Sequence, residues 1–110
     1  MVRPLEGIRV IDFTNAVAGP IATFILADLG AEVIKVEEPS GRPLHAVGTA
    51  PLQPGAPDVT YNRIMVFNEL SHGKRGISLN VSTEAGREVF LKLAAKVDVV
   101  IDNFAPGAMK

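Results

Sequence analysis

Residues 8–36 read IRVIDFTNAVAGPIATFILADLGAEVIKV, and this segment carries the clearest structural pattern in the chain. Ile8 to Phe13 is a short run rich in β-branched and aromatic side chains, which is typical of a buried strand. Gly19-Pro20 then opens a helix, because proline is tolerated at an early helical position, and Gly30 ends it. Glu32 to Val36 predicts a second strand, so the segment predicts a strand–helix–strand unit.

The second half of the chain repeats the alternation of strand and helix. Ile77, Leu79 and Val81 alternate with polar residues and predict a strand with one polar face. Thr83 is a suitable N-cap for a helix that runs to Lys96, and residues 98–102 (DVVID) predict a fourth strand. We therefore predict an α/β fold built on an open parallel sheet with flanking helices.

Apolar side chains line one face of each predicted helix. Ile21, Ile25 and Leu29 recur every fourth residue in the first helix, and the face of the later helix consists of Val89, Phe90, Leu93, Ala94 and Val97. The first, second and fourth strands are continuous apolar runs, as expected for strands covered on both faces. Since two clear helices are few for this task, we infer that the chain is part of a longer protein or leans on a partner.

Three segments have weaker patterns. Residues 39–57 hold five prolines and three glycines, and so predict a long loop that is either functional or a surface excursion. Asp58 can cap a short helix through about Leu70. Pro106 can start another helix at the end of the sequence.

Composition excludes several classes of protein. The chain has 110 residues, which corresponds to one small domain at most, and 47% of them are hydrophobic. Eleven basic and twelve acidic residues give a net charge of −1, which argues against a nucleic-acid-binding protein. Cysteine is absent, so there is no thiolate metal site or cysteine nucleophile, and two histidines leave little for a metal. No membrane span or signal peptide is indicated, and we expect a cytoplasmic protein.

Ligands of open parallel sheets bind beyond the carboxyl ends of the strands. Four segments are expected at that edge, namely residues 14–19, 37–43, 80–83 and 103–107. Residues 14–19 lead into a helix N-terminus, which can bind phosphate, but the dinucleotide and P-loop glycine patterns are both absent. From spacing alone this turn is more often only a turn.

A few charged residues are candidates for chemistry, and each has a simpler interpretation. His72, Lys74 and Arg75 form a basic cluster that could meet a phosphate or carboxylate, although a solvated turn is commoner. Asp12 fits a hydrogen-bonded carboxylate at a strand end. Glu37 and Glu38 follow a strand and could receive a ribose hydroxyl, but a solvated strand end is the simpler interpretation. His45, in the proline-rich loop, also fits a solvated residue.

Several residue strings, in order and in register, resemble the start of the family III (CaiB/BaiF) CoA-transferases. They lie at residues 4–14 (PLEGIRVIDFT), 18–20 (AGP), 26–37 (LADLGAEVIKVE), 67–68 (FN), 73–81 (GKRGISLNV), 83–86 (TEAG) and 98–108 (DVVIDNFAPGA). The resemblance covers essentially the whole chain except the proline-rich loop. Many separate motifs in one register are far more specific than a single short pattern.

The resemblance implies a Rossmann-like large domain, of which residues 1–110 would be the incomplete N-terminal, CoA-binding part. It also implies an interlocked homodimer and transfer of CoA between an acyl-CoA thioester and a carboxylic acid, without a metal. The reaction of the family proceeds through an aspartyl anhydride and an aspartyl-CoA thioester. The nucleophilic aspartate is expected beyond Lys110, so neither Asp98 nor Asp102 is assigned that role.

Family positions that contact coenzyme A can be carried over one by one. Val17 and Ala18 match the turn that borders the CoA and the acyl group, and formyl-CoA transferase has glutamine in place of Val17. Leu79, Asn80, Val81 and Ser82 match the adenosine segment, where Asn80 and Ser82 replace an acid and a lysine. The remaining matched contacts are Asn103, Phe104 and Ala105.

Two features leave alternatives open. Glu38 stands where the family has a phosphate-binding arginine, and Arg42 could supply that charge, as could Lys74. The motifs are also shared with α-methylacyl-CoA racemases, so an isomerase is an alternative. A naturally truncated module that binds CoA or a partner without catalysis is a further alternative.

Overall fold

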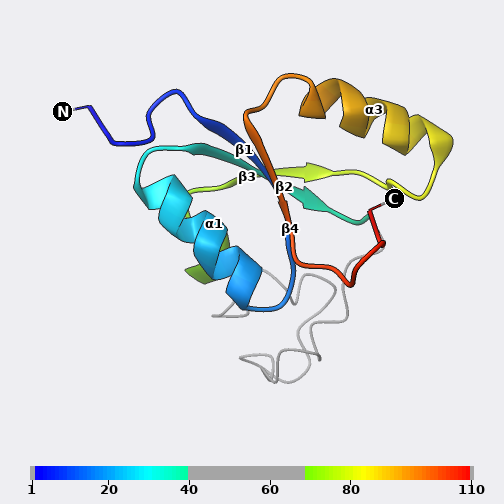
Figure 1. Cartoon of the computed structure of the whole chain (residues 1–110), viewed down its shortest axis with the longest axis horizontal. Helices are drawn as coiled ribbons and strands as arrows, with labels where there is room; N and C mark the ends of the chain where they lie inside the picture. Colours follow the sequence, from blue (N-terminus) through cyan, green and yellow to red (C-terminus); the bar gives the residue numbers. More distant parts are fainter. Residues whose placement is uncertain (1, 40–68, 110) are drawn as a thin grey trace, which may run out of the picture.

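A four-stranded parallel sheet organises the part of the chain that the computed structural model describes, which is residues 2–39 and 69–109. The strands are β1 (Arg9–Phe13), β2 (Glu32–Glu37), β3 (Arg75–Ser78) and β4 (Val99–Asp102), and their order is β3-β2-β1-β4. Each neighbouring pair is parallel, as Figure 1 shows. The predicted α/β fold with an open parallel sheet is confirmed.

Two helices pack on opposite faces of this sheet (Figure 1). Helix α1 (Ala18–Asp28) places Thr23 against Asp12 of β1, whereas α3 (Glu84–Ala94) places Phe90 against the neighbouring residue, Phe13. Successive side chains of a strand point to opposite faces, so α1 and α3 must lie on different sides. Residues 69–71 are also helical and lead through a turn into β3.

The core lies in the two central strands. Val10 and Val33, paired across β1 and β2, are each 1% exposed and cluster with Ala27 and Ala31. Ile11 on the other face of β1 is fully buried. Burial of aliphatic side chains from both strands stabilises the sheet centre, because each contributes about 1.5 to 3 kcal/mol when removed from water.

The third strand differs from the prediction. It was expected around residues 77–81, but β3 begins at Arg75 and ends at Ser78. Arg75 and Gly76, predicted as part of a turn, pair with Ile34 and Lys35 of β2, so backbone pairing overrides the local turn signal. Residues 79–83 form the connection to α3 instead.

Coverage of the apolar surfaces also differs from the prediction. Within the described residues β4 is an edge strand, so Val99 and Val100 are 40% and 43% exposed rather than covered on both faces. The predicted apolar face of α1 points outward, and its three residues are exposed; they are Ile21, Ile25 and Leu29. The side of α1 that meets the sheet carries small and polar residues, namely Gly19, Pro20, Thr23 and Ala27.

Some expectations fall at the margins of the described residues. The proline-rich loop 39–57, with Arg42 and His45, and the helix expected from Asp58 lie almost entirely outside them. Pro106 begins a turn closed by a hydrogen bond from Ala108 N to Ala105 O at 3.1 Å, and no helix is formed over the described residues there. Among the helices that can be described, none is long and apolar enough to cross a membrane.

Candidate functional site

The carboxyl ends of the four strands lie at one edge of the sheet, because all neighbouring strands are parallel. From β1 the chain passes to β2 on one side, and it later reaches β4 on the other side. The direction of winding therefore reverses between β1 and β4, and ligands of open α/β sheets bind at such a reversal. The segments that follow β1 and β4 are thus the centre of the candidate site.

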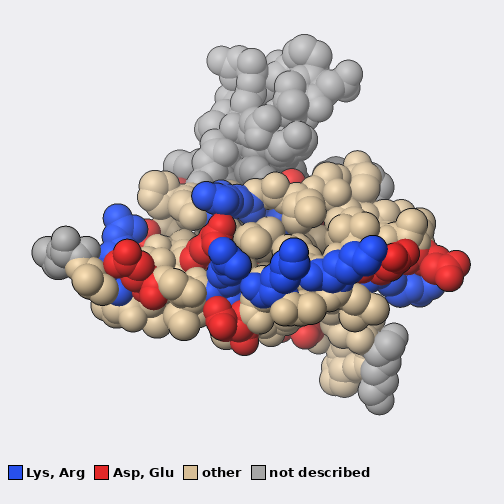
Figure 2. All heavy atoms as spheres, turned by 90° about the horizontal axis from the view of Figure 1, so that it is seen from above, with Lys and Arg blue, Asp and Glu red and all other residues tan. Residues whose placement is uncertain are grey.

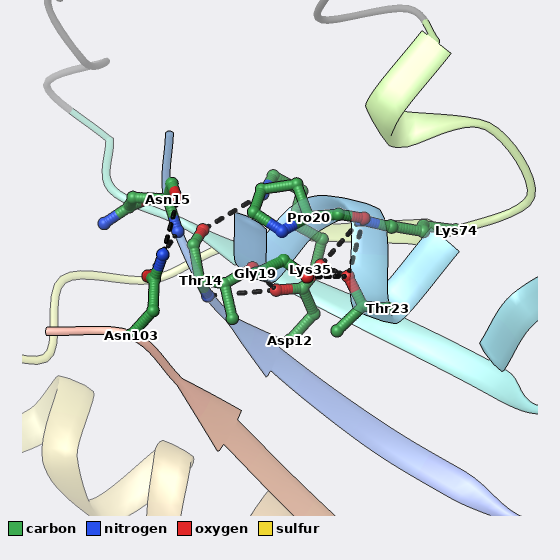
Figure 3. A network of polar contacts seen from close by, with 9 residues as sticks. All are labelled: Asp12, Thr14, Asn15, Gly19, Pro20, Thr23, Lys35, Lys74 and Asn103. Carbon is green, nitrogen blue, oxygen red and sulfur yellow. Dashed lines mark hydrogen bonds and ion pairs between the residues drawn. The ribbon is translucent and has the colours of Figure 1, made fainter. Parts of the chain in front are cut away.

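Two asparagines join these segments. Asn15 N donates to Oδ1 of Asn103 at 2.8 Å, and Nδ2 of Asn103 donates to the Asn15 carbonyl at 2.7 Å. The two residues are 88 positions apart in the sequence. The Asn103 side chain therefore uses its oxygen and one of its amide hydrogens to hold the turn after β1 beside the end of β4 (Figure 3).

Aromatic rings support the same junction from the α3 side. The ring of Phe13 lies 5.3 Å from that of Phe104 and 5.6 Å from that of Phe90, measured between centroids. Both arrangements are tilted or edge-on, which is favourable for aromatic pairs. Phe104 is half-buried, so it packs on the sheet and also leaves apolar surface at the edge.

A buried carboxylate lies under the turn after β1. Asp12 is fully buried, and its Oδ1 accepts hydrogen bonds from the backbone N–H and the hydroxyl of Thr14. Its Oδ2 accepts from the Thr23 hydroxyl at 2.6 Å and from Lys74 Nζ at 2.8 Å. The three residues that supply these four donors, Thr14, Thr23 and Lys74, converge on Asp12 in Figure 3. Four donors match the acceptor capacity of an ionised carboxylate, so Asp12 has none left for a substrate.

The charge of Asp12 is kept by these partners. Burial by itself would raise the pKa of the carboxyl, but hydrogen bonds from Lys74, Thr14 and Thr23, with the charge of Lys35, outweigh it and lower the pKa. Lys35 Nζ also donates to the Thr14 carbonyl at 3.4 Å. The carboxylate is therefore ionised at neutral pH, and it forms a buried ion pair with Lys74.

The turn from β1 into α1 has two unusual features. Ala16 adopts a left-handed backbone conformation, with φ of 60°, which residues with a Cβ rarely adopt. Gly19 packs so closely on Thr14 that an added Cβ would lie 2.4 Å from the Thr14 Cβ. Among the residues that the structure describes, no side chain caps α1 at Val17, and the first turn of α1 holds no acidic residue. The first N–H groups of α1 therefore face the edge without a capping side chain.

The turn from β3 into α3 is built from local contacts. Thr83 caps α3 by accepting a hydrogen bond from Gly86 N at 3.0 Å, as predicted, and Glu84 lies in the first turn. Asn80 Oδ1 accepts from Ser82 N at 2.9 Å, and the Asn80 carbonyl accepts from the Thr83 hydroxyl at 2.9 Å. These bonds close a tight turn beside the end of β2.

The expected basic cluster does not exist as a cluster. Lys74 is buried beside Asp12, Arg75 forms an exposed ion pair with Glu32 at 3.0 Å, and the His72 ring lies 6.0 Å from that of Phe24. Lys74 is therefore not a solvated turn residue. It is also not a free cation for a phosphate, because its ammonium forms an ion pair with Asp12. Figure 2 shows a row of adjacent Lys and Arg side chains across the middle of one face, with acidic side chains beside the row and at its ends.

The structure brings together only part of the predicted set. Val17, which is 44% exposed, and Ala18 follow β1, while Asn103, Phe104 and Ala105 follow β4 at the same junction. The second group follows β3 at the same sheet edge, but β2 separates it from β1; it consists of Leu79, Asn80, Val81 and Ser82. Arg42 lies outside the described residues, and Glu38 is exposed after β2.

The network around Asp12 was largely missed from the sequence. The prediction of Asp12 as a hydrogen-bonded carboxylate is confirmed, but its partners come from three separate segments. A charged residue inside an apolar strand is a signal that a buried partner exists. Lys35 and Lys74 both satisfy that signal, and only the fold shows which of them forms the ion pair.

No metal centre is indicated by the residues that can be placed. Within residues 2–39 and 69–109, no group of three or more histidine, aspartate or glutamate side chains is arranged to hold a metal ion. The candidate site is thus an edge of N–H groups, amides and apolar side chains.

Relatives with sequences close to this one are CoA-transferases. The chain is 43% identical over 109 residues to a probable fatty acyl-CoA transferase of Mycobacterium tuberculosis, covering 98% of this chain and 26% of that protein. It is 42% identical to a formyl-CoA:oxalate CoA-transferase of Streptomyces avermitilis, covering 99% and 25%, respectively. It is 39% identical to a succinyl-CoA:mesaconate CoA-transferase of Haloarcula marismortui, covering 96% and 26%. The chain therefore spans about a quarter of the length of these relatives.

Solved structures agree with the sequence matches. A crystal structure of the Mycobacterium tuberculosis protein superposes with a TM-score of 0.80 at 42% identity, covering 98% of this chain and 28% of that one. A CaiB/BaiF family protein from Brucella suis superposes with a TM-score of 0.73 at 38% identity, covering 99% and 28%. The family model described as CoA-transferase family III matches residues 5–110. The chain, with its parallel sheet and its joined β1 and β4 ends, thus belongs to CoA-transferase family III.

Proposed function

We propose that the protein carrying this chain moves coenzyme A between an acyl-CoA thioester and a carboxylic acid. Residues 1–110, with the proline-rich loop 39–57, would form the N-terminal part of its CoA-binding domain. The observation that carries the proposal is the junction of the β1 and β4 ends by Asn15 and Asn103, at the reversal of the sheet. A homodimer and a cytoplasmic location are part of the same proposal, on the strength of family membership.

The residues at this junction suit the chemical groups of coenzyme A. Val17 and Phe104 offer apolar surface for the pantetheine arm or the acyl group. The start of α1, which no side chain caps, offers N–H donors and the positive end of the helix dipole to a phosphate or a thioester oxygen. Ala18 is small enough to let a ligand approach the backbone. Ala105 borders the same junction on the β4 side.

Asn103 has a more specific role in this proposal than general contact with the ligand. Its Oδ1 and one amide hydrogen are engaged by Asn15, which leaves its second amide hydrogen for coenzyme A. Leu79, Asn80, Val81 and Ser82 would border the adenosine end from the β3 side, and Arg42 would supply a cation for the phosphates. Lys74 is excluded from that task because its charge is paired with Asp12.

The resemblance to the family implies that the reaction uses a carboxylate nucleophile. It attacks the thioester carbonyl, releases the CoA thiolate and forms a mixed anhydride. The thiolate then attacks the enzyme carbonyl of that anhydride, which releases the first acid and leaves an enzyme-bound thioester. The acceptor acid reverses both steps. Asp12 cannot serve, since it is fully buried and engaged by four donors. The resemblance to the family implies a nucleophilic aspartate beyond Lys110, and we adopt that position in this proposal.

Acyl exchange in the complete protein tests the proposal. The donors are succinyl-CoA and formyl-CoA, and the acceptors are oxalate, mesaconate and L-malate, which are named in the activities of relatives. We expect a new CoA thioester to form only when an acceptor acid is present, in amounts equal to the donor consumed, as followed by liquid chromatography. Acid-independent epimerisation of a 2-methylacyl-CoA would instead support a racemase. CoA binding without either reaction would support a non-catalytic module.

A further inference from the structure

Lys74 lies in the interior although it comes from a short connection before β3. Its side chain is 1% exposed, and its ammonium lies 2.8 Å from Asp12 Oδ2 and 3.1 Å from the Pro20 carbonyl. One cation thus reaches a strand and the first turn of α1, across 62 and 54 residues of sequence. Figure 3 shows it entering the network from the side opposite to Asn103.

The charge of Lys74 determines what Asp12 can do. As an ionised carboxylate, Asp12 accepts from Thr14 N at 2.9 Å and from the Thr23 hydroxyl at 2.6 Å. A neutral carboxyl group would donate one hydrogen and lose acceptor capacity, so this pattern of bonds would change. A buried carboxylate without a cation is strongly unfavourable. The contacts that fix Thr14 and Thr23 therefore depend on Lys74.

The turn between Thr14 and Gly19 needs such support. Ala16 has a φ of 60°, and a residue with a Cβ stays in this region only when the surrounding structure holds it there. Asp12 holds the turn at Thr14, Asn103 holds it at Asn15, and Lys74 holds the Pro20 carbonyl. Of these three contacts, Lys74 contributes to two, through Asp12 and directly.

We propose that Lys74 is a positioning residue for the coenzyme edge. Acting through Asp12 and the Pro20 carbonyl, Lys74 keeps the turn from Thr14 to Ala18 in the conformation that places Val17 and Ala18 at the carboxyl edge of the sheet. Lys74 does not touch the ligand. That the presented residues meet coenzyme A rests on the proposed function, whereas the effect of Lys74 on the turn itself does not.

The test measures the turn and the ligand separately in the complete protein. Hydrogen exchange by mass spectrometry reports on the peptide that covers residues 13–18, and calorimetry reports the affinity for free CoA. For Lys74→Met we expect exchange in that peptide to accelerate and the Kd for CoA to rise, each by about 10- to 100-fold, as for residues that orient metal ligands indirectly. Exchange in residues 86–94 of α3, on the other face, should accelerate much less than exchange in residues 13–18.

Two controls separate positioning from simple loss of stability. Val33→Ala leaves a cavity in the hydrophobic cluster of Val10, Ala27 and Ala31, and the aliphatic Val33 side chain takes part in none of the hydrogen bonds of the network. At a matched loss of thermal stability, this variant should keep the exchange rate of residues 13–18 and the affinity for CoA. If Val33→Ala weakens CoA binding as much as Lys74→Met does, Lys74 is only a stabilising residue and the proposal is wrong.

The double variant Asp12→Leu with Lys74→Met is the second control. It removes both charges, so the thermal stability should recover toward that of the wild type while residues 13–18 stay unprotected. Recovery of the protection as well would overturn the proposal. Should Lys74→Met fail to fold, Lys74→Gln retains a donor for Asp12 and is expected to give a smaller change in the same direction. Wild-type protein that does not bind CoA would refute the proposed function, and the exchange experiment would still decide the role of Lys74.

Discussion

The two turns that lead from a strand into a helix are built in different ways. In the turn from β3 to α3, Leu79 N still donates to the Glu37 carbonyl of β2 at 2.8 Å, but the side-chain hydrogen bonds over residues 80–86 join residues two or three positions apart, such as Thr83 and Gly86. The turn from β1 to α1 is held by Asp12, Lys74 and Asn103, of which the last two come from distant parts of the sequence. The first is a local structure, and the second exists only in the folded chain.

This difference teaches where a ligand edge can arise. The start of α3 is occupied by its own Thr83 hydroxyl, which accepts from Gly86 N, and by Glu84, which matches the helix dipole. At α1 no side chain from residues 2–39 or 69–109 forms such a cap, and the Asp12 network behind the turn keeps its backbone in position. Long-range support therefore leaves the helix start open to a ligand, whereas local capping uses it.

The largest expected effect comes from breaking the long-range support. Lys74→Met removes the ion-pair partner of the buried Asp12 carboxylate and leaves only the charge of Lys35 near it, and we expect a loss of about 3 to 5 kcal/mol in the free energy of unfolding. Urea denaturation of the complete protein, with Lys92→Met as control, measures it. Lys92 pairs with Glu88 at 2.8 Å on the surface, so its removal should be almost neutral. Similar losses of unfolding free energy in both variants would mean that the buried ion pair contributes no more to stability than the surface pair.

Close packing is the next point of comparison, because each turn has a glycine pressed against it. A Cβ at Gly86 would lie 1.8 Å from the Asn80 carbonyl oxygen, and one at Gly19 would lie 2.4 Å from the Thr14 Cβ. We expect Gly86→Ala to cost about 1 to 3 kcal/mol or more, and Gly19→Ala somewhat less. Gly76→Ala is the matched control, since its added Cβ would meet no atom of the described residues within 4 Å, apart from its own chain neighbours. Tolerance of alanine at Gly86 would contradict the tight local turn.

Removing the cap of α3 should have a smaller effect. Thr83→Ala deletes the acceptor for Gly86 N, and we expect a loss of about 1 kcal/mol, with Thr83→Ser close to wild type. Acyl exchange by the complete protein should change little, because the cap supports the local turn and not the β1 junction. A loss of stability as large as that of Lys74→Met would remove the distinction between the two turns.

The effect of acid is confined to low pH. The pKa of Asp12 is lower in the folded chain than its ordinary value of 3.8, so the stability it contributes is complete above that value and is lost as the pH falls through the folded pKa. Wild type and Asp12→Asn should therefore differ by a constant amount near neutral pH, and the difference should shrink below about pH 4. Urea midpoints measured along this pH range check the sign. A difference that shrinks already above pH 6 would contradict the lowered pKa.

Much of the fold could be predicted because its signals are local. The β-branched runs of β1 and β2, the proline at the start of α1, and the Thr83 cap of α3 all act through neighbouring residues, and the structure confirms them. The position of β3 could not be predicted in this way. Arg75 and Gly76 have weak strand propensity, and they become a strand because β2 offers backbone groups to pair with.

The candidate site also has a part that local patterns predict and a part that they do not. Its edge could be predicted, since strand ends are read from local patterns and parallel strands bring them together. Which side chains contact one another at this edge could not be predicted from local patterns. Lys35 and Lys74 are equivalent partners for Asp12 from the sequence alone, and the distances of the fold select Lys74 for the ion pair.

The sequence by itself determined the α/β alternation, the parallel sheet, the caps and the family, because these depend on short-range preferences and on motifs in one register. Only the tertiary structure decided that Lys74 is buried, that Asn103 holds Asn15, and that the apolar stripe of α1 points outward. The physical reason is that a buried charge is stable only beside partners with the right geometry, and that geometry arises from elements brought together across 62 or more residues.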